Sequence, residues 1–135
     1  MSSIEAALYS ILSTDPAITA IVSDRIYYNR RPDSPVNPSL SYFLVISMPM
    51  ESLSGPVDLS SPTFQFDCWS TVSQLEAKTL ARKVRAALHG FRGVVSGVDI
   101  NGITDWSEQD MYEQDTKTFR TFAQCDVWHG ETLAA

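Results

Sequence analysis

The chain has 135 residues, a net charge of −6 at pH 7, 44% hydrophobic residues and 19% charged residues. This composition excludes a disordered chain, and the length is typical of one domain that removes roughly two-thirds of its unfolded surface from water. We therefore expect a single folded unit over residues 1–135. The acidic balance disfavours a surface that neutralises many phosphates, although it suits a surface along which nucleic acid slides without binding.

The sequence carries no signal for a membrane or for export. No apolar run is long enough to span a bilayer, and the first residues, MSSIEAALYS, contain neither a basic leader nor a small-residue cleavage site. We expect a soluble protein that begins in the cytoplasm and has no membrane partner. Two cysteines are too few for a disulfide framework, so both should remain thiols in a reducing compartment.

Two short helices are predicted at the start of the chain. Ser2 followed three residues later by Glu5 is a capping-box pattern, and apolar residues then recur on one helical face. Asp15 followed by Pro16 predicts the N-cap and the first residue of a second helix. The residues expected to point inward are Ile4, Leu8, Ile11 and Leu12 in the first helix and Ile18, Ile21 and Val22 in the second.

The next segments alternate between predicted strands and loops. DRIYYN (24–29) is typical of a short strand, and the three prolines of RRPDSPVNPS (30–39) favour a loop because proline lacks a backbone donor. LSYFLVISM (40–48) is apolar on both strand faces, which predicts a central strand covered on both sides. Residues 49–62 are rich in serine and proline, and we expect a long loop there.

A strand and a long helix follow. TFQFDCWS (63–70) alternates like a strand, and residues 71–90 carry apolar residues at helical spacing, with Thr71 or Ser73 as the N-cap and Gly90 at the end. The residues expected to face the core are Ala77, Leu80, Ala81, Val84, Ala87 and Leu88. The outer face is basic, and a solvated helix face explains it better than a phosphate-binding ridge. Its basic residues are Lys78, Arg82 and Arg85.

The last third predicts a long hairpin or meander. Residues 98–114 lead out and residues 116–130 return, with a turn or bulge between Asp99 and Gly102. Acidic residues surround the expected tip, and paired carboxylates of this kind can bind a divalent metal or share a proton. Their spacing is not that of a calcium-binding loop, so a solvated turn is favoured. These residues are Glu108, Asp110, Glu113 and Asp115.

Two five-residue segments have closely similar sequences, QFDCW (65–69) and QCDVW (124–128). Because side chains alternate along a strand, Cys68 and Cys125 are both expected to face apolar neighbours. Burial there raises the pKa of a thiol and leaves it inert, whereas a nucleophile needs an exposed, electropositive niche. The apolar neighbours are Phe64, Phe66, Ala123 and Val127.

The histidines add no catalytic pattern. His89 and His129 stand in no catalytic or metal-ligand spacing, and two cysteines with two histidines so far apart are a weak zinc signal. The sequence therefore predicts structural cysteines, no catalytic residue, no metal site and no cofactor.

In both five-residue segments, the strand face opposite the cysteine carries polar and aromatic residues. Aromatic residues are enriched where proteins meet, so this face is a candidate subunit interface. A tryptophan at a strand end is also often a core residue beneath a loop, and both interpretations stay open. The residues are Gln65, Asp67, Trp69, Gln124, Asp126 and Trp128.

The order of these elements carries a family resemblance. The chain opens with IEAALYSILSTDPAITAIVSDRIYY, followed by a proline-rich loop, an apolar strand, an alternating strand ending in DCWS, a helix through LARKVRAAL and a closing strand RTFAQCDVWH. In this order the segments resemble the tail completion, or tail terminator, family of long-tailed bacteriophages and phage-like particles over nearly the whole chain. The stretch NPSLSYFLV departs from the family pattern because it has extra residues between the proline loop and the aromatic strand.

The resemblance implies an α+β subunit, with a mainly antiparallel or mixed sheet of about four to five strands and two main helices packed on one face. It implies a structural virion protein, not an enzyme, that is assembled in the host bacterial cytoplasm and forms a hexameric ring on the head-proximal end of the tail. The expected partners are the tail tube protein, the head–tail connector or stopper protein, and DNA that passes through the lumen without specific binding. The particle would be a virus or a gene transfer agent.

Within such a ring, the polar and aromatic face is expected to contact neighbouring subunits, and the acidic tip to line the lumen or touch the next ring. Two other function classes remain open. A nucleic-acid-binding sheet also exposes aromatic residues, but it is usually basic. A small thiol enzyme would need a reactive cysteine.

Overall fold

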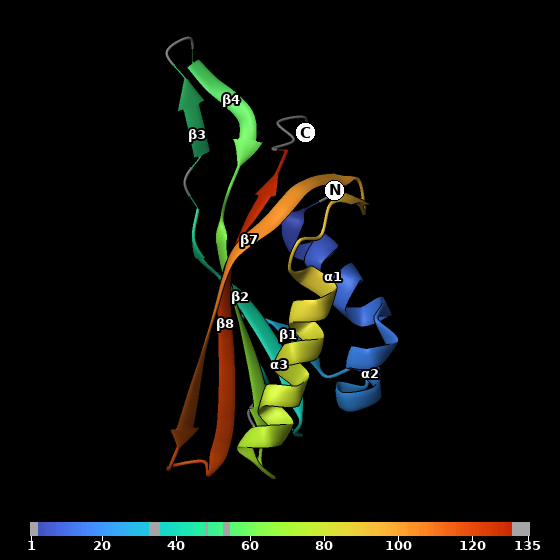
Figure 1. Cartoon of the computed structure of the whole chain (residues 1–135), viewed down its shortest axis with the longest axis vertical. Helices are drawn as coiled ribbons and strands as arrows, with labels where there is room; N and C mark the ends of the chain where they lie inside the picture. Colours follow the sequence, from blue (N-terminus) through green and yellow to red (C-terminus); the bar gives the residue numbers. More distant parts are fainter. Residues whose placement is uncertain (1–2, 33–35, 48, 53–54, 131–135) are drawn as a thin grey trace.

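The computed structural model describes residues 3–32, 36–47, 49–52 and 55–130. Within these residues the chain forms three helices and eight strands (Figure 1). In chain order the elements are α1 (Ile4–Thr14), α2 (Pro16–Val22), β1 (Ile26–Tyr28), β2 (Ser39–Ile46), β3 (Pro49–Ser52), β4 (Gly55–Ser60), β5 (Thr63–Ser70), α3 (Gln74–Leu88), β6 (Gly93–Val95), β7 (Val98–Glu113) and β8 (Thr118–His129).

The two N-terminal helices begin at side-chain caps. Ser3, not Ser2, caps α1, because its hydroxyl accepts a hydrogen bond from the Ala6 amide at 3.1 Å. Ser2 lies outside the described residues. The Asp15 carboxylate accepts from the Ala17 amide at 2.9 Å and Pro16 opens α2, which confirms the predicted start of the second helix.

Helix α3 also matches its prediction. The Ser73 hydroxyl accepts from the Glu76 amide at 3.1 Å, which decides between the two expected caps. Gly90 follows the helix with φ +81°, a conformation that suits glycine at a helix end. Every residue predicted to face the core is buried except Ala87, which is half-buried and packs against the core.

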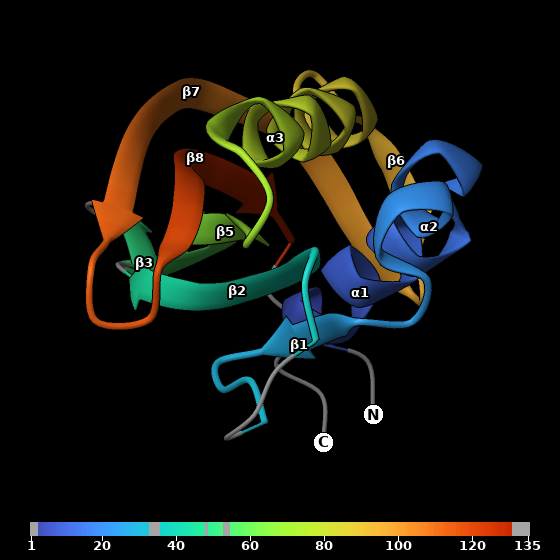
Figure 2. The ribbon, with the colours of Figure 1, turned by 90° about the horizontal axis from the view of Figure 1, so that it is seen from below.

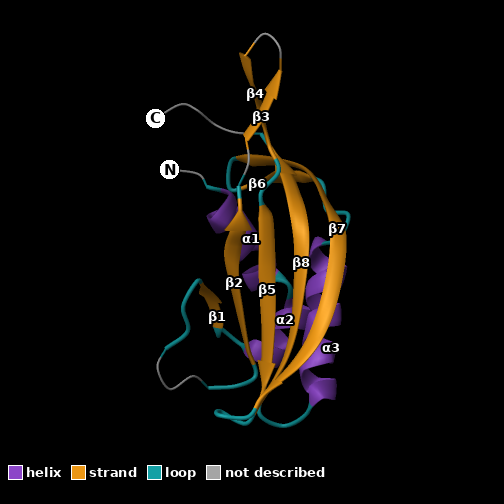
Figure 3. Ribbon diagram, turned by 90° about the vertical axis from the view of Figure 1, so that its left-hand side faces the viewer, coloured by secondary structure: helices purple, strands orange, loops and turns teal. Residues whose placement is uncertain are grey.

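The sheet is mixed. β1 pairs with β2 in parallel, and the other ladders are antiparallel. The strands run in the order β1-β2-β5-β8, with β7 on the far side of β8 and β6 on β7. Figure 3 shows this sheet with all helices behind it, and Figure 2 shows the sheet curling around them. The α+β class is confirmed, although the described residues contain more strands than expected.

The core lies between the sheet and the three helices. The aromatic rings of Tyr42 and Phe66 stack with centroids 5.6 Å apart, and Trp106 follows at 6.3 Å from Phe66. The Tyr42 hydroxyl donates to the Glu5 carbonyl at 2.8 Å, which ties the sheet to α1. Within the described part of the chain, no helix combines the length and apolar character needed to cross a membrane.

β2 is covered on both faces only along its first half. Ser39 through Tyr42 are buried, whereas Leu44, Val45 and Ile46 are 37%, 45% and 52% exposed. β1 pairs with β2 only from Leu40 to Tyr42, so no residue of β1 lies beside this exposed end of β2. The prediction of a fully covered strand is therefore wrong for this end.

The predicted loop over residues 49–62 is instead mostly a hairpin. β3 and β4 pair with each other and continue β2 and β5 past the end of β8, so that the hairpin projects from the body (Figure 1). Among the described residues, the ladder between β4 and β8 has one pair, Ser60 with His129. The prolines of this segment are nevertheless compatible with strands. Pro49 is the first residue of β3, and Pro56 lies in β4, whose edge away from β3 has little pairing.

The long C-terminal hairpin of β7 and β8 is confirmed. The register shifts between Ile100 and Gly102, so the expected turn or bulge near Asp99 is a bulge. A second shift falls between Thr104 and Ser107. These bulges let the sixteen residues of β7 follow the curl of the sheet.

Candidate functional site

The helix-free face of the sheet carries the polar and aromatic residues selected from the sequence. Ladder pairing places Gln65 opposite Gln124, and Trp69 opposite Arg120. Directly paired residues of antiparallel strands lie on the same face, so β5 and β8 present these side chains together. Asp126 joins them through a 2.6 Å hydrogen bond from the Thr63 hydroxyl. Trp128 donates from its indole to the Thr104 hydroxyl at 3.0 Å.

Half of these residues are already buried inside the chain. Trp69 is 8% exposed and Asp67 is 4% exposed. The Trp69 indole donates to the Ser41 hydroxyl at 3.0 Å, and its ring lies under two guanidinium groups, of Arg31 at 3.7 Å and of Arg120 at 5.0 Å. Trp69 therefore fits the core alternative, while a subunit-interface role for the whole set stays a prediction. Gln65 is also buried, and Gln124, Asp126 and Trp128 are half-buried.

A connected polar network crosses this face. The Gln124 amide donates to Gln65 at 2.9 Å, and the Gln65 amide donates to the Asp67 carboxylate at 2.9 Å. Arg120 donates to Asp67 at 3.2 Å and to Glu113 at 3.2 Å. Burial raises the pKa of Asp67, although the hydrogen bond from Gln65 and the charge of Arg120 oppose the shift. The network fixes the relative positions of β5, β7 and β8.

The acidic residues of the β7–β8 hairpin do not form one cluster. Asp115 lies in the turn at residues 114–117 and Glu113 ends β7, but Glu108 and Asp110 lie within the strand, whose bounds match the outgoing limb predicted over residues 98–114. Asp110 pairs with Lys78 of α3 at 3.0 Å, and the hydrogen bond from Lys78 lowers the pKa of that carboxyl. Among the described residues, no group of three or more His, Cys, Asp or Glu side chains is placed to hold a metal ion.

The glutamate at position 108 has its own local partner. Glu108 accepts a hydrogen bond from the Trp106 indole at 2.9 Å. Of the four acidic residues, Glu113 and Asp115 lie at the predicted tip of the hairpin. The assignment of the four carboxylates to a lumen or to an inter-ring contact stays a prediction.

The two thiols face the core, as predicted. Cys68 and Cys125 are both 1% exposed and free. Burial raises the pKa of Cys125 to about 12 and raises the pKa of Cys68 well above its ordinary value. The ladder partners of Cys68 are Leu40 and Thr121, neither of which is a base. These surroundings keep the thiols protonated and disfavour nucleophilic chemistry.

The histidines lie at the ends of other elements. His89 is exposed at the end of α3, with its ring 6.0 Å from that of Trp106. His129 ends β8 and its Nδ1 lies 2.8 Å from the Gly130 carbonyl oxygen.

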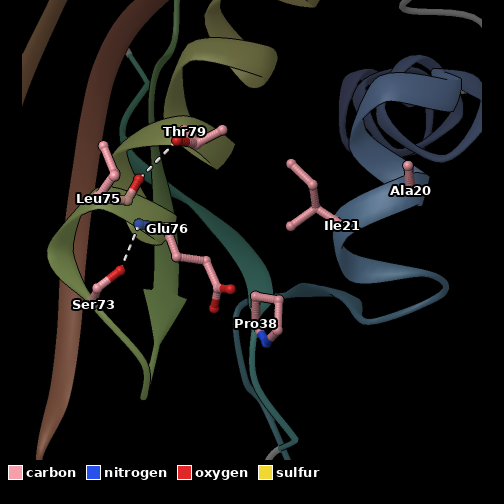
Figure 4. Close-up of a pocket in the computed structure, with 7 residues that line it drawn as sticks. All are labelled: Ala20, Ile21, Pro38, Ser73, Leu75, Glu76 and Thr79. Atoms are coloured by element: carbon pink, nitrogen blue, oxygen red, sulfur yellow. Dashed lines mark hydrogen bonds between the residues drawn. The ribbon is translucent and has the colours of Figure 1, made fainter.

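A groove that the sequence did not predict opens between α2 and the start of α3 (Figure 4). It has a volume of about 530 Å³. Leu75 is 67% exposed beside it, and Val72 precedes it with 72% exposed. Leu75 falls off the buried stripe of α3 and Val72 precedes the helix, and these exposed apolar residues are the signal that the sequence offered. The lining residues are Ala20, Ile21, Pro38, Ser73, Leu75, Glu76 and Thr79.

A second hollow of about 490 Å³ has a different chemistry. It lies where the loop after β1 approaches the β7–β8 turn, and it is lined by Asn, Arg, Pro and Thr residues. Burial lowers the pKa of the Arg31 guanidinium here, whereas Glu113 and Asp67 oppose that shift. The lining residues are Asn29, Arg30, Arg31, Pro32, Asn37, Thr71, Thr116 and Thr118.

Comparisons with known proteins agree with this architecture. One solved chain, from a structure described as the virion of a native gene transfer agent particle, has a TM-score of 0.68 at 17% sequence identity, with 95% of both chains covered. Another solved chain has a TM-score of 0.63 at 14% identity, covering 98% of this chain and 96% of its own. At these identities the likeness concerns the fold. No curated protein sequence matches.

A family model described as tail completion protein gp17 matches residues 6–130, which is nearly the whole chain. The proteins of this family are structural components of phage virions rather than enzymes, and they act in assembly with other tail or virion proteins. The chain belongs to the tail completion protein gp17 family of phage tail structural proteins.

Proposed function

We propose that the chain forms a ring on the head-proximal end of the tail tube. There it ends tube polymerisation and joins the tail to the head connector or stopper protein. The observation that carries this proposal is the family match over residues 6–130. The similar fold in a gene transfer agent virion supports it, because that chain is also part of a particle.

The ring is proposed to be a hexamer assembled in the host bacterial cytoplasm. A closed ring of identical subunits needs two different patches on each subunit, which meet head to tail. The curled sheet offers two such patches, because its two margins are different strands, β1 and β7 (Figure 3). The polar network between them gives each subunit a rigid face to present to its neighbours.

The helix-free face is proposed to contribute to the subunit contact through its half-buried residues. Gln124, Asp126 and Trp128 retain surface for a neighbour, whereas Trp69 and Asp67 support them from beneath. Aromatic residues with free surface are favoured as interface anchors.

The acidic tip of the β7–β8 hairpin is proposed to face the lumen. The chain has a net charge of −6, and Asp115 lies in the exposed turn between β7 and β8. A negative wall repels phosphate groups, so DNA would pass without binding specifically. Asp110 and Glu113 already have cationic partners and would add less to this field.

The test is deletion of the coding sequence in the particle that carries it. We expect heads without attached tails, or tails of irregular and excessive length, in electron micrographs. Supplying the wild-type chain from a plasmid should restore normal particles. Normal tails of normal length, joined to heads in the deletion strain, would contradict the proposal.

A further inference from the structure

One margin of the sheet combines apolar side chains with arginine. It consists of β1, the loop after it and the end of β2, and we call it the arginine margin. β2 leaves three consecutive apolar residues exposed, Leu44, Val45 and Ile46. Exposed apolar residues that gather in one place commonly mark an interaction surface. The residues of the arginine margin are Tyr28, Arg30, Val36, Leu44, Val45 and Ile46.

The other margin is the outer edge of β7 at residues 107–113, which we call the acidic margin. β6 pairs with β7 only from Val98 to Ile100, so among the described strands none pairs with the outer edge of residues 107–113. An unpaired edge is a ready site for association. Met111 and Tyr112 are exposed on it.

A hollow opens beside the acidic margin. Its volume is about 350 Å³, and Phe122 and Gln124 of β8 line it together with three residues of β7. It therefore offers a partly apolar recess next to an acidic strand, on the face that carries Gln124. The β7 residues are Ser107, Glu108 and Gln109.

The two margins complement each other. Tyr, Met and Arg are enriched in interface cores, and both margins supply residues of these kinds. Glu108 on one margin and Arg30 on the other have opposite charges, which steers their encounter. Two acidic margins would repel each other, so a symmetric contact between identical patches is disfavoured. The margins also lie at opposite ends of the strand order, which lets a single contact repeat around a ring axis (Figure 3).

The basic face of α3 is a less suitable complement. Lys78 of this helix pairs with Asp110 of β7 within the same chain at 3.0 Å, so α3 and the acidic margin are neighbours on one subunit. This ion pair already compensates part of the positive charge of α3, which leaves less of it to offer to a second copy.

We infer that the acidic margin of one copy docks against the arginine margin of a second copy, with apolar residues of β2 entering the hollow beside Phe122. This inference rests on the proposed ring function and names its lateral contact. It goes beyond that function because it assigns a specific pair of surfaces.

The test uses one charge-changing variant on each margin of the full chain. Gln109→Arg places a cation opposite Arg30, and Val45→Glu places an anion opposite Glu108. Both side chains are exposed, so circular dichroism and a thermal melt should show a folded protein. Arg82→Glu, on the exposed outer face of α3, is the matched control.

Self-association is measured by sedimentation velocity up to about millimolar concentration, where contacts of modest affinity are populated. We expect the wild type and Arg82→Glu to form oligomers, and each margin variant to associate at least tenfold more weakly, approaching the 15.0 kDa of one chain. A mixture of the two margin variants should form a dimer, because each keeps one intact margin that fits the other. A symmetric contact would give no such rescue.

Two results would overturn the inference. One is a wild-type chain that stays monomeric over the whole concentration range. The other is oligomers of unchanged mass in both margin variants, which would leave the ring itself in place but move its contact elsewhere. The deletion phenotype tests the ring function separately, so the two failures are distinguishable.

Discussion

The guanidinium carbon of Arg31 lies 3.7 Å from the centroid of the Trp69 ring. This contact closes one end of the helix-free face, because Arg31 comes from the loop after β1 and Trp69 from near the end of β5. Arg31 is held by hydrogen bonds to Asn37 at 3.2 Å and to Ser39 at 3.3 Å. The loop is therefore fastened to the sheet through a cation placed over an aromatic ring.

Trp69→Ala should destabilise the fold by about 3 kcal/mol or more, because it removes a large buried ring and leaves a cavity. The measurement is the free energy of unfolding from urea denaturation. Trp128→Ala is the matched control, since Trp128 is only half-buried, and its loss should be clearly smaller. Equal losses in the two variants would contradict the core role of Trp69.

Arg120→Met should cost about 3 kcal/mol of folding stability, because Asp67 would stay buried without its cation. The methionine keeps most of the apolar stem, so the loss reports the charge. Lys78→Met is the control, because Lys78 and Asp110 are about 40% exposed and such pairs contribute about 1 kcal/mol or less. Asp67→Asn added to Arg120→Met should recover part of the loss, and no recovery would argue against an uncompensated carboxylate.

Both cysteines should resist labelling in the native protein. Burial protects Cys68 and Cys125 from solvent and raises the pKa of each thiol, so little thiolate is available to react at pH 8. Incubation with iodoacetamide should modify neither residue until guanidinium unfolds the chain, when both should react. Mass spectrometry of the native sample gives the answer, and rapid labelling there would reopen the thiol-enzyme alternative.

Stability should fall at alkaline pH. Burial raises the pKa of Cys125 from 9.0 to about 12, so the folded-state pKa exceeds the unfolded one. The stabilising contribution is therefore complete below about pH 9 and is lost as pH rises from 9 toward 12. Burial also raises the pKa of Tyr42 and of Cys68, which acts in the same direction. Melting temperatures measured between pH 8 and pH 11 should decline less steeply in Cys125→Ala, and parallel curves would contradict this assignment.

The sequence predicted those elements whose signals are local. The caps at Asp15 and Ser73, the apolar stripe of α3 and the alternation around Cys68 and Cys125 depend on residues a few positions apart. Alternation also identified which residues share the helix-free face. It did not show what covers that face, because the contact of Arg31 with Trp69 depends on the return of a distant loop.

The hairpin of β3 and β4 was missed for a related reason. Its serines and prolines are typical of a loop, and its pairing follows from the register of β2 with β5, which no local pattern contains. The groove beside Leu75 was missed because it needs α2 and α3 side by side. The outgoing limb over residues 98–114 was predicted, but the acidic residues were expected together at the tip, whereas the ladder with β8 places Glu108 and Asp110 along the strand.

The most direct test of the ring proposal is an electron cryo-microscopy reconstruction of the neck of the particle that carries this chain. We predict six copies of this fold in one ring between the tail tube and the head connector, with the β7 edge of each copy beside the β1–β2 margin of the next. Density for the chain at the distal tail tip or within the capsid shell, or its absence from the neck, would contradict the account.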